Sequence, residues 1–274
     1  NLSGSNASST VTGISITLGT TTTVYNNILG DLRTTAANAA NPLVGIAVSG
    51  GTTVNLYNNT VWLNGTSAGA LFGSSAVSAS TSPTLTMRNN LFVNLSTPSG
   101  AGLTVAYRRS SSTLTTYGSA SNNNCLYAGT PGASNLLFYD GTNSEQTIAG
   151  YKTRVSPRDI SSMTENVTFR STSSASADFL KIDSTVSTQL ESNGQTISTP
   201  AITNDYFDIA RFPNAGYPTN PGFTAVGPDV GAHEFGGVQL DLNGPNISYT
   251  ALLNTGSTGD RSLTAVITDA SGVA

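Results

Sequence analysis

The most informative segment of the chain is Leu56-Tyr57-Asn58-Asn59-Thr60-Val61-Trp62-Leu63-Asn64, in which an Asn pair separates two short apolar runs. The same arrangement occurs at residues 24–29 and 87–94 and, in a weaker form, at 121–127. The first Asn of the pair recurs after 32, 31 and 34 residues. A nearly constant period of this length is typical of a solenoid, in which each repeat forms one coil.

One repeat, residues 45–65, contains three short β-type runs separated by turn residues, with no helical spacing between them. Three strands per coil predict an all-β fold, a right-handed parallel β-helix, with equivalent strands about 4.8 Å apart along the axis. Alternation along the second strand places two sets of side chains inside. These sets are Val24, Leu56 and Met87, and Thr22, Val54 and Leu85.

The Asn pairs are predicted to form a structural ladder at the corner between the second and third strands of each coil. Asn tolerates the left-handed backbone of a sharp corner, and its amide can bond the same residue one coil away. Such bonds would satisfy main-chain groups that the sheets do not reach. The predicted ladder consists of Asn26, Asn27, Asn58, Asn59, Asn89, Asn90, Asn123 and Asn124.

The composition narrows the class of protein. Only 9% of the residues are charged, and the net charge is −4, so no basic face indicates nucleic-acid binding. No apolar run approaches the ~20 residues that span a bilayer, which argues against membrane insertion. The single cysteine, Cys125, is expected to be a buried, inert thiol. The chain begins and ends within its pattern, without a signal peptide, and is interpreted as a piece of a longer secreted chain.

Three regions are expected along the chain. Residues 1–128 carry the regular coils, and residues 129–237 form the final coils and a segment that closes the β-helix. Within this second region a short helix is predicted at residues 144–152, capped by Asn143 or Ser144. Short strands are predicted at residues 167–169 and 178–182. Residues 238–274 contain two alternating runs, 247–253 and 262–269, too few strands for a stable domain.

Charged residues gather near the end of the second region. We expect a capping network in which Arg211 is buried and bonded to at least one of Asp205, Asp229 and Glu234. His233 is expected to pack beside it. A calcium site formed by the same carboxylates is the alternative, although we expect neither a metal nor a cofactor.

A family resemblance rests on several of these segments. The Asn-Asn coils, Arg158-Asp159-Ile160-Ser161, Asp178-Phe179-Leu180, Asp205 with Arg211, and Pro228-Asp229-Val230-Gly231-Ala232-His233-Glu234 resemble pectin-lyase-like parallel β-helix domains of bacterial surface proteins. Those domains commonly end on a D-x-G-A-x-E type segment. This chain has Asp208 where the family often has Gly. Residues 238–274 are similar to the start of the immunoglobulin-like repeats found in tandem on type IX-secreted surface proteins.

The leading hypothesis is a non-catalytic module of a large secreted bacterial cell-surface protein. It would act as an adhesin or stalk in surface attachment or gliding motility, with a weak glycan-binding face. Expected partners are surface polysaccharides or other cell-surface proteins, and the export machinery during secretion.

Two alternatives stay open. One is a polysaccharide lyase or glycoside hydrolase with its site between residues 140 and 235, because residues 1–130 contain a single acid, Asp31. The other is an ice-binding β-helix, suggested by outward ladders of small polar side chains. These ladders are Thr21, Thr53 and Thr84, and Thr23, Asn55 and Thr86.

Overall fold

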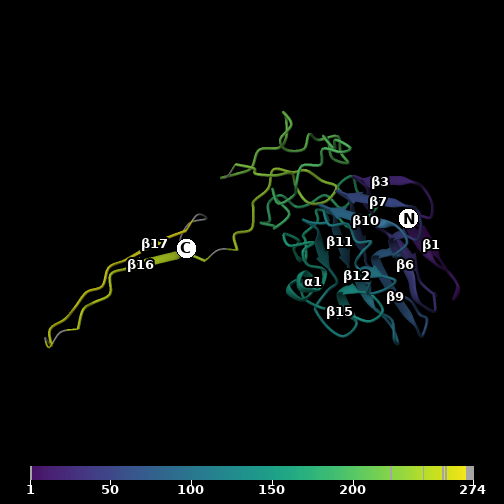
Figure 1. Ribbon diagram of the computed structural model, residues 1–274, viewed down its shortest axis with the longest axis horizontal. Coiled ribbons are helices and arrows are strands. Elements are labelled where there is room, and N and C mark those ends of the chain that lie inside the picture. The colour runs from purple at the N-terminus through teal and green to yellow at the C-terminus, as the bar shows by residue number, and fades with distance from the viewer. Residues whose placement is uncertain (1, 223, 243, 255, 257, 270–274) are drawn as a thin grey trace. The chain divides into compact units, whose positions relative to one another are not determined.

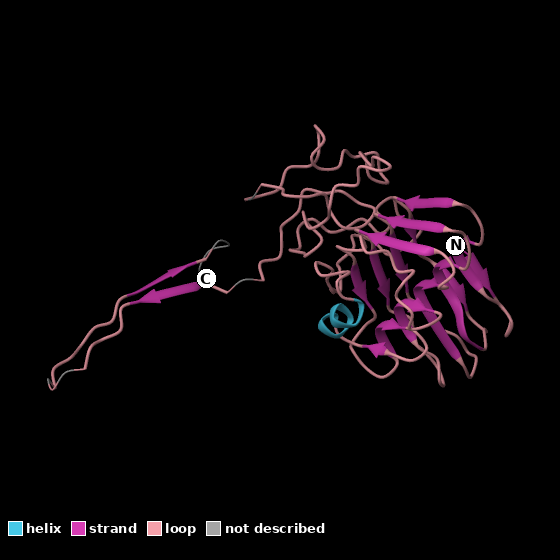
Figure 2. Cartoon of the chain, viewed as in Figure 1, coloured by secondary structure: helices cyan, strands magenta, loops and turns pink. Residues whose placement is uncertain are grey.

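A computed structural model describes residues 2–222, 224–242, 244–254, 256 and 258–269 of the 274-residue chain. Two compact units are present, residues 1–239 and residues 240–274. The first unit is a parallel β-helix of about four coils (Figure 1). Its strands are joined mostly by turns and loops, and one short helix is present among the described residues (Figure 2).

Three stacked sheets form the walls of the β-helix. The widest contains β2 (Val11–Ile16), β6 (Ala39–Val48), β9 (Phe72–Ala79), β12 (Thr104–Arg109), β14 (Asn135–Tyr139) and the antiparallel β15 (Ser144–Glu145). The second contains β3 (Thr21–Tyr25), β7 (Thr53–Tyr57) and β10 (Thr84–Arg88). The third contains β4 (Ile28–Leu29), β8 (Thr60–Leu63), β11 (Leu91–Asn94) and β13 (Cys125–Tyr127). A smaller parallel pair joins β1 (Leu2–Gly4) to β5 (Leu32–Thr34).

The predicted register of the second sheet is confirmed. Leu56 pairs with Val24 on one side and with Met87 on the other, and Val54 pairs with Thr22 and Leu85. Leu56, Met87, Val54 and Leu85 are fully buried. The period of the sequence therefore reports the pairing between coils, because a shift by one residue would turn these side chains to the outside.

The carboxyl-terminal end of the core is covered by α1 (Ile148–Val155), which packs Tyr151 and Val155 against it. The helix begins later than predicted. Thr147 is its N-cap, in extended conformation, and accepts a hydrogen bond from the Gly150 N–H at 3.2 Å. Residues 144 and 145 instead pair with β14, where Phe138 lies opposite Glu145 and Tyr139 opposite Ser144. The antiparallel pairing at this sheet edge decides against an earlier helix start.

Residues 164–222 and 224–239 belong to the region that was expected to close the β-helix, and they cover its side. They run back over the outside of the third sheet, mostly as loops (Figure 2). Outward side chains of this sheet, such as Leu91, Val93 and Cys125, form a second core with Val167, Ile182, Leu190, Val230 and Phe235. The predicted strands at 167–169 and 178–182 are reduced to isolated bridges, Phe169 with Ile182 and Ser171 with Phe179.

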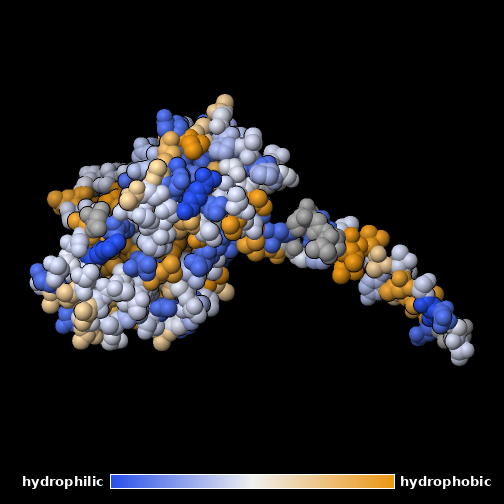
Figure 3. Space-filling view, turned by 180° about the vertical axis from the view of Figure 1, so that it is seen from behind, coloured by the Kyte–Doolittle hydropathy of each residue, from blue (hydrophilic) through white to orange (hydrophobic). Residues whose placement is uncertain are grey.

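The cover extends to the second sheet. Tyr57, which follows the inward-facing Leu56 and so points to the outer face of the strand, is buried in a small cluster with Ile197 and Ile202. The side of the β-helix is thus a packed interface between an early coil and a late segment of the chain. Seen from behind, the surface is mostly of intermediate hydropathy, with scattered hydrophobic and hydrophilic residues (Figure 3).

The second unit contains a two-stranded antiparallel ribbon, β16 (Asn246–Tyr249) and β17 (Ala265–Thr268). All eight residues of these strands are exposed. Both strands are shorter than the predicted runs. The second predicted run, 262–269, ends at the last residue that the structure describes. Whether the ribbon opens an immunoglobulin-like repeat stays a prediction. Within the described part of the chain, no helix has the length and apolar character to cross a membrane.

Candidate functional site

The second Asn of each pair forms a continuous ladder through the interior corner. The Nδ2 groups of Asn27, Asn59 and Asn90 each donate to Oδ1 of the Asn one coil further, at 2.9–3.0 Å. Each of these Oδ1 atoms also accepts a hydrogen bond from the main-chain N–H of the Asn one coil earlier. Asn59, Asn90 and Asn124 are fully buried. These bonds satisfy corner groups that the strands leave unpaired.

The ladder ends on Asp159, which the sequence reasoning did not single out as a site residue. Asn124 Nδ2 donates to its Oδ1 at 2.9 Å, and Ser162 Oγ donates to the same oxygen at 2.6 Å. The hydroxyls of Tyr117 and Tyr151 donate to its other oxygen. Asp159 lies 35 residues after Asn124, so the continuing period is the signal that could have identified it. A carboxylate suits this position because it only accepts hydrogen bonds.

The first Asn of each pair has a different task. Asn26, Asn58, Asn89 and Asn123 all have left-handed backbones, with φ between 50° and 57°. Three of these side chains point outward and bind the covering segment. Asn26 Nδ2 donates to Asn204 O at 2.6 Å, Asn89 to Gln195 O at 2.7 Å, and Asn123 to Asn193 O at 2.7 Å. The second Asn of each pair thus stabilises the coil, while Asn26, Asn89 and Asn123 anchor residues 193–204.

Arg211 is the centre of the predicted capping network and is 1% exposed. Its Nη1 donates to Glu234 Oε2 at 2.9 Å and to the Asp229 carbonyl at 3.3 Å. Its Nη2 donates to the Gly231 carbonyl at 2.8 Å and to Asn26 Oδ1 at 3.1 Å. The bond to Asn26 shows that this network clamps the covering segment to the first coil instead of closing the last one.

The other two carboxylates of the predicted network bind main-chain donors. Asp205 accepts the N–H groups of Phe207, Ile209 and Glu234 at 2.7–2.9 Å. Asp229 accepts those of Ser192 and Phe235. Among the described residues, no group of three or more His, Cys, Asp or Glu side chains is arranged to hold a metal ion. The carboxylates of this cluster stabilise loops, because main-chain N–H groups donate to the oxygens that a cation would need.

Burial shifts the protonation of the acids in this cluster. Burial, and then the charges of Glu234 and Glu191, raise the pKa of Asp229 well above its ordinary value. Burial likewise raises the pKa of Glu191, which bonds Ser192 and Gly237. Burial also raises the pKa of Glu234, against the opposing effect of Arg211. Glu191 was missed by the sequence reasoning, since an acid in a loop carries no periodic signal.

His233 does more than pack. Its Nδ1 accepts the main-chain N–H of Ile182 at 3.1 Å, and its ring lies against Phe207 and Phe235. Burial, and then the charge of Lys181, lower the pKa of His233 to about 4. The neutral ring therefore joins the 178–182 loop to the 229–235 segment. Asp208, in the place where the resembling domains have Gly, has φ 64° and so adopts the conformation that Gly favours.

The widest sheet carries no Asp or Glu in β2, β6, β9, β12 or β14. Its outer face does carry Arg108, whose Nε donates to Ser75 Oγ and whose guanidinium lies over Tyr139. Burial lowers the pKa of Arg108. Cys125 is fully buried, and burial raises the pKa of its thiol, which leaves it unsuited to nucleophilic chemistry.

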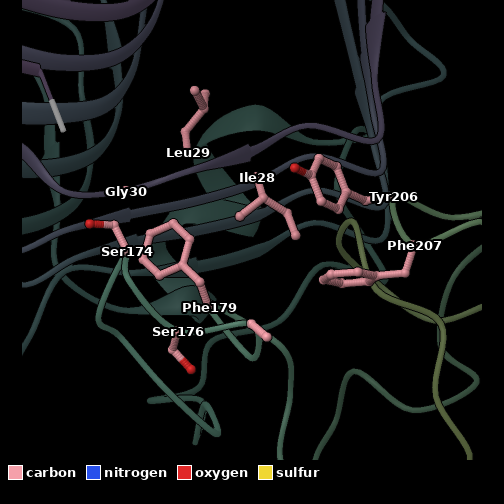
Figure 4. A pocket seen from close by; sticks show the side chains of 9 residues that line it. Ile28, Leu29, Gly30, Ser174, Ser176, Phe179, Tyr206 and Phe207 are labelled. Carbon is pink, nitrogen blue, oxygen red and sulfur yellow. The ribbon is translucent and has the colours of Figure 1, made fainter.

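Two neighbouring pockets open beside the first coil. The first, of about 350 Å³, lies between Ile28–Gly30 and loops that carry Phe179, Tyr206 and Phe207 (Figure 4). The second, of about 340 Å³, lies between Asp31–Arg33, Trp62 and Thr172. The sequence reasoning did not find them, because each has one wall from the first two coils and one from the covering segment. No known protein family, curated protein or solved structure matches the chain.

Proposed function

We propose that this chain is a non-catalytic module of a large secreted bacterial cell-surface protein, in which it serves as an adhesin or stalk. The observation that carries the proposal is how its carboxylates are used. Asp205 and Asp229 receive main-chain N–H groups, and Glu234 pairs with Arg211. A glycosidase needs two carboxylates that are free to act on a glycosidic bond. The three carboxylates named here instead stabilise loops through hydrogen bonds and an ion pair.

The architecture also supports a mechanical role. The Asn ladder connects successive coils, and the Arg211 clamp joins the first coil to a late segment. A solenoid tied lengthwise in this way resists unravelling from either end, which suits a stalk that experiences shear. In this proposal the partners are surface polysaccharides or other cell-surface proteins. The export machinery handles the chain during type IX secretion, and residues 238–274 open an immunoglobulin-like repeat in a protein for attachment or gliding motility.

The competing proposal is a polysaccharide lyase or hydrolase. One observation favours it: Arg108 Nη2 is buried without a hydrogen-bond partner near the outer face of the widest sheet. A reducing-sugar assay and an unsaturated-product assay over pectic and alginate-type substrates separate the two proposals. We expect no turnover. Turnover that is lost in Asp205→Ala or Asp229→Ala, in variants whose circular dichroism is unchanged, would replace the structural proposal with an enzymatic one.

Ice binding is a minor alternative. The ladder of small polar side chains on the second sheet borders Tyr57, which Ile197 and Ile202 cover. This reduces the flat exposed area that ice binding requires. Purified protein that shows thermal hysteresis and shapes ice crystals would support this alternative.

A further inference from the structure

The two pockets beside the first coil lie next to each other along the side of the β-helix. Gly30 lines the first pocket, and its neighbour Asp31 lines the second. On the opposite wall, Ser174 lines the first pocket and Thr172 lines the second. A hydrogen bond from Ser174 Oγ to Asp31 Oδ2, at 2.6 Å, crosses between the walls at this boundary. The pockets therefore form two compartments of one groove, and each has a volume within the ~300–1,000 Å³ of small-ligand sites.

Aromatic side chains lie in both compartments. Phe179, Tyr206 and Phe207 line the first, and Trp62 lines the second. In the close view Tyr206 and Phe179 lie on either side of Ile28, and Phe207 lies below them (Figure 4). Tyr206 is 55% exposed although its ring contacts Phe207. The exposed face of such a ring can contact the apolar parts of a ligand.

The aromatic wall is held in place before any ligand arrives. Phe207 makes an edge contact with Tyr206, with ring centroids 5.0 Å apart, and a second with His233 at 5.3 Å. Lys181 Nζ lies 4.8 Å from the Phe207 ring centroid. The loop that carries both rings is tied to the first coil by the bond from Asn26 to Asn204. Preorganisation of this kind reduces the entropy lost on binding.

The polar groups of the groove are mostly uncharged. They are the hydroxyl and amide groups of Ser174, Ser176, Thr35, Thr66, Thr172 and Asn64. The only charged lining residues are Asp31 and Arg33, which pair with each other at 2.7 Å. The hydrogen bond from Ser174, and then the Arg33 guanidinium, lower the pKa of Asp31, so it remains a strong acceptor at neutral pH.

We propose that this groove binds a neutral oligosaccharide, with one sugar ring against Tyr206 and Phe207 and another against Trp62. The apolar C–H faces of sugar rings pack on aromatic side chains, while their hydroxyls donate to Asp31 and accept from Arg33 and the neighbouring hydroxyl groups. The inference rests on the proposed function and gives the surface module its ligand class and its site.

Other ligands fit the groove less well. A nucleic acid needs several free cations, and an acidic glycan needs at least one, whereas Arg33 is already paired with Asp31. An extended peptide that adds a strand to a sheet edge needs a longer edge than β4 offers, since β4 has two residues. Asp31 together with aromatic rings and hydroxyl groups matches a polyhydroxylated, uncharged ligand best.

The test begins with an array of neutral, acidic and amino-sugar oligosaccharides, followed by isothermal titration calorimetry with the best neutral oligosaccharide found. We expect neutral oligosaccharides to bind. Tyr206→Ala and Trp62→Ala should each weaken binding by at least about tenfold, because each removes one of the two stacking surfaces. Tyr25→Ala is the matched control: its ring is 46% exposed on the second sheet and does not line the groove. It should bind as the parent protein does.

Thermal unfolding followed by circular dichroism shows whether each variant is folded. The proposal is overturned if folded Tyr206→Ala and Trp62→Ala bind as tightly as the parent protein, or if no neutral oligosaccharide binds. It is also overturned if acidic glycans bind best and Arg33→Gln abolishes their binding. Failure of the proposed function is a separate result: it appears as turnover in the substrate assays, whether or not the groove binds sugar.

Discussion

Arg211 shows how one side chain joins distant parts of this chain. Its guanidinium reaches Glu234 and two carbonyls within the covering segment, and Asn26 on the first coil. Burial of a guanidinium requires such partners because the group cannot lose its charge. The residues that meet here are 185 positions apart, so the clamp depends on the folded structure of both segments.

We predict that Arg211→Ala lowers the free energy of unfolding by about 3–5 kcal/mol, because Glu234 would remain buried without its charged partner. Urea unfolding followed by fluorescence measures this loss. Arg170→Ala is a suitable control, since Arg170 is exposed and its side chain bonds only Ser184 among the partners identified. Equal unfolding midpoints for the two variants would contradict a clamping role for Arg211.

At the level of elements, the corner ladder couples the coils. Asn90 is an interior rung whose side chain accepts from Asn59 and donates to Leu56 O and Asn124 Oδ1. Asn27 is the first rung and donates only to Tyr25 O and Asn59 Oδ1. The ladder therefore offers an internal comparison between two chemically identical side chains.

We predict that Asn90→Ala destabilises the protein by at least about 3 kcal/mol and Asn27→Ala by about 1 kcal/mol. The interior substitution removes the side-chain acceptor of the buried Asn59 N–H and the side-chain donor to Leu56 O, whereas the terminal one affects a half-exposed corner. Chemical denaturation of both variants under identical conditions measures the difference. If the two losses are equal, the ladder does not act as a connected unit.

At the level of the whole molecule, the stability depends on two opposing titrations. The raised pKa values of Asp229 and Glu191 mean that the folded state binds more protons than the unfolded state above their ordinary values of 3.8 and 4.5. Stability from these groups is present at low pH and is lost as the pH rises. His233 acts in the opposite sense: its stabilising effect is present above pH 6.5 and is lost as the pH falls toward about 4.

We predict that Glu191→Gln reduces the loss of unfolding free energy that the buried carboxyl groups cause as the pH rises above 4.5. The substitution removes one like charge near Asp229 and keeps an oxygen that can accept from Ser192 or Gly237. Urea midpoints across this range measure the slope. A slope unchanged by Glu191→Gln would show that this carboxylate does not cause the decline.

The period of the chain is enough to predict the β-helix, its register and a corner ladder, although only the second Asn of each pair forms that ladder. Each of these depends on contacts between a residue and its equivalent one coil away, and such contacts leave a period in the chain. The recurring Asn pairs place Asn59 against Asn90, and the alternation around them places Leu56 and Met87 inside. The same period, continued from Asn124, reaches Asp159.

The position of residues 164–222 and 224–239, and the contacts that they create, could not be read from the chain and emerge in the folded protein. Their packing on the third sheet joins Arg211 to Asn26, buries Tyr57, and encloses the groove between Trp62 and Tyr206. The concentration of charges around Arg211 indicated a network, but not the coil to which it attaches. Docking of an irregular segment depends on the complementarity of two distant surfaces, and nothing in the chain repeats to record it.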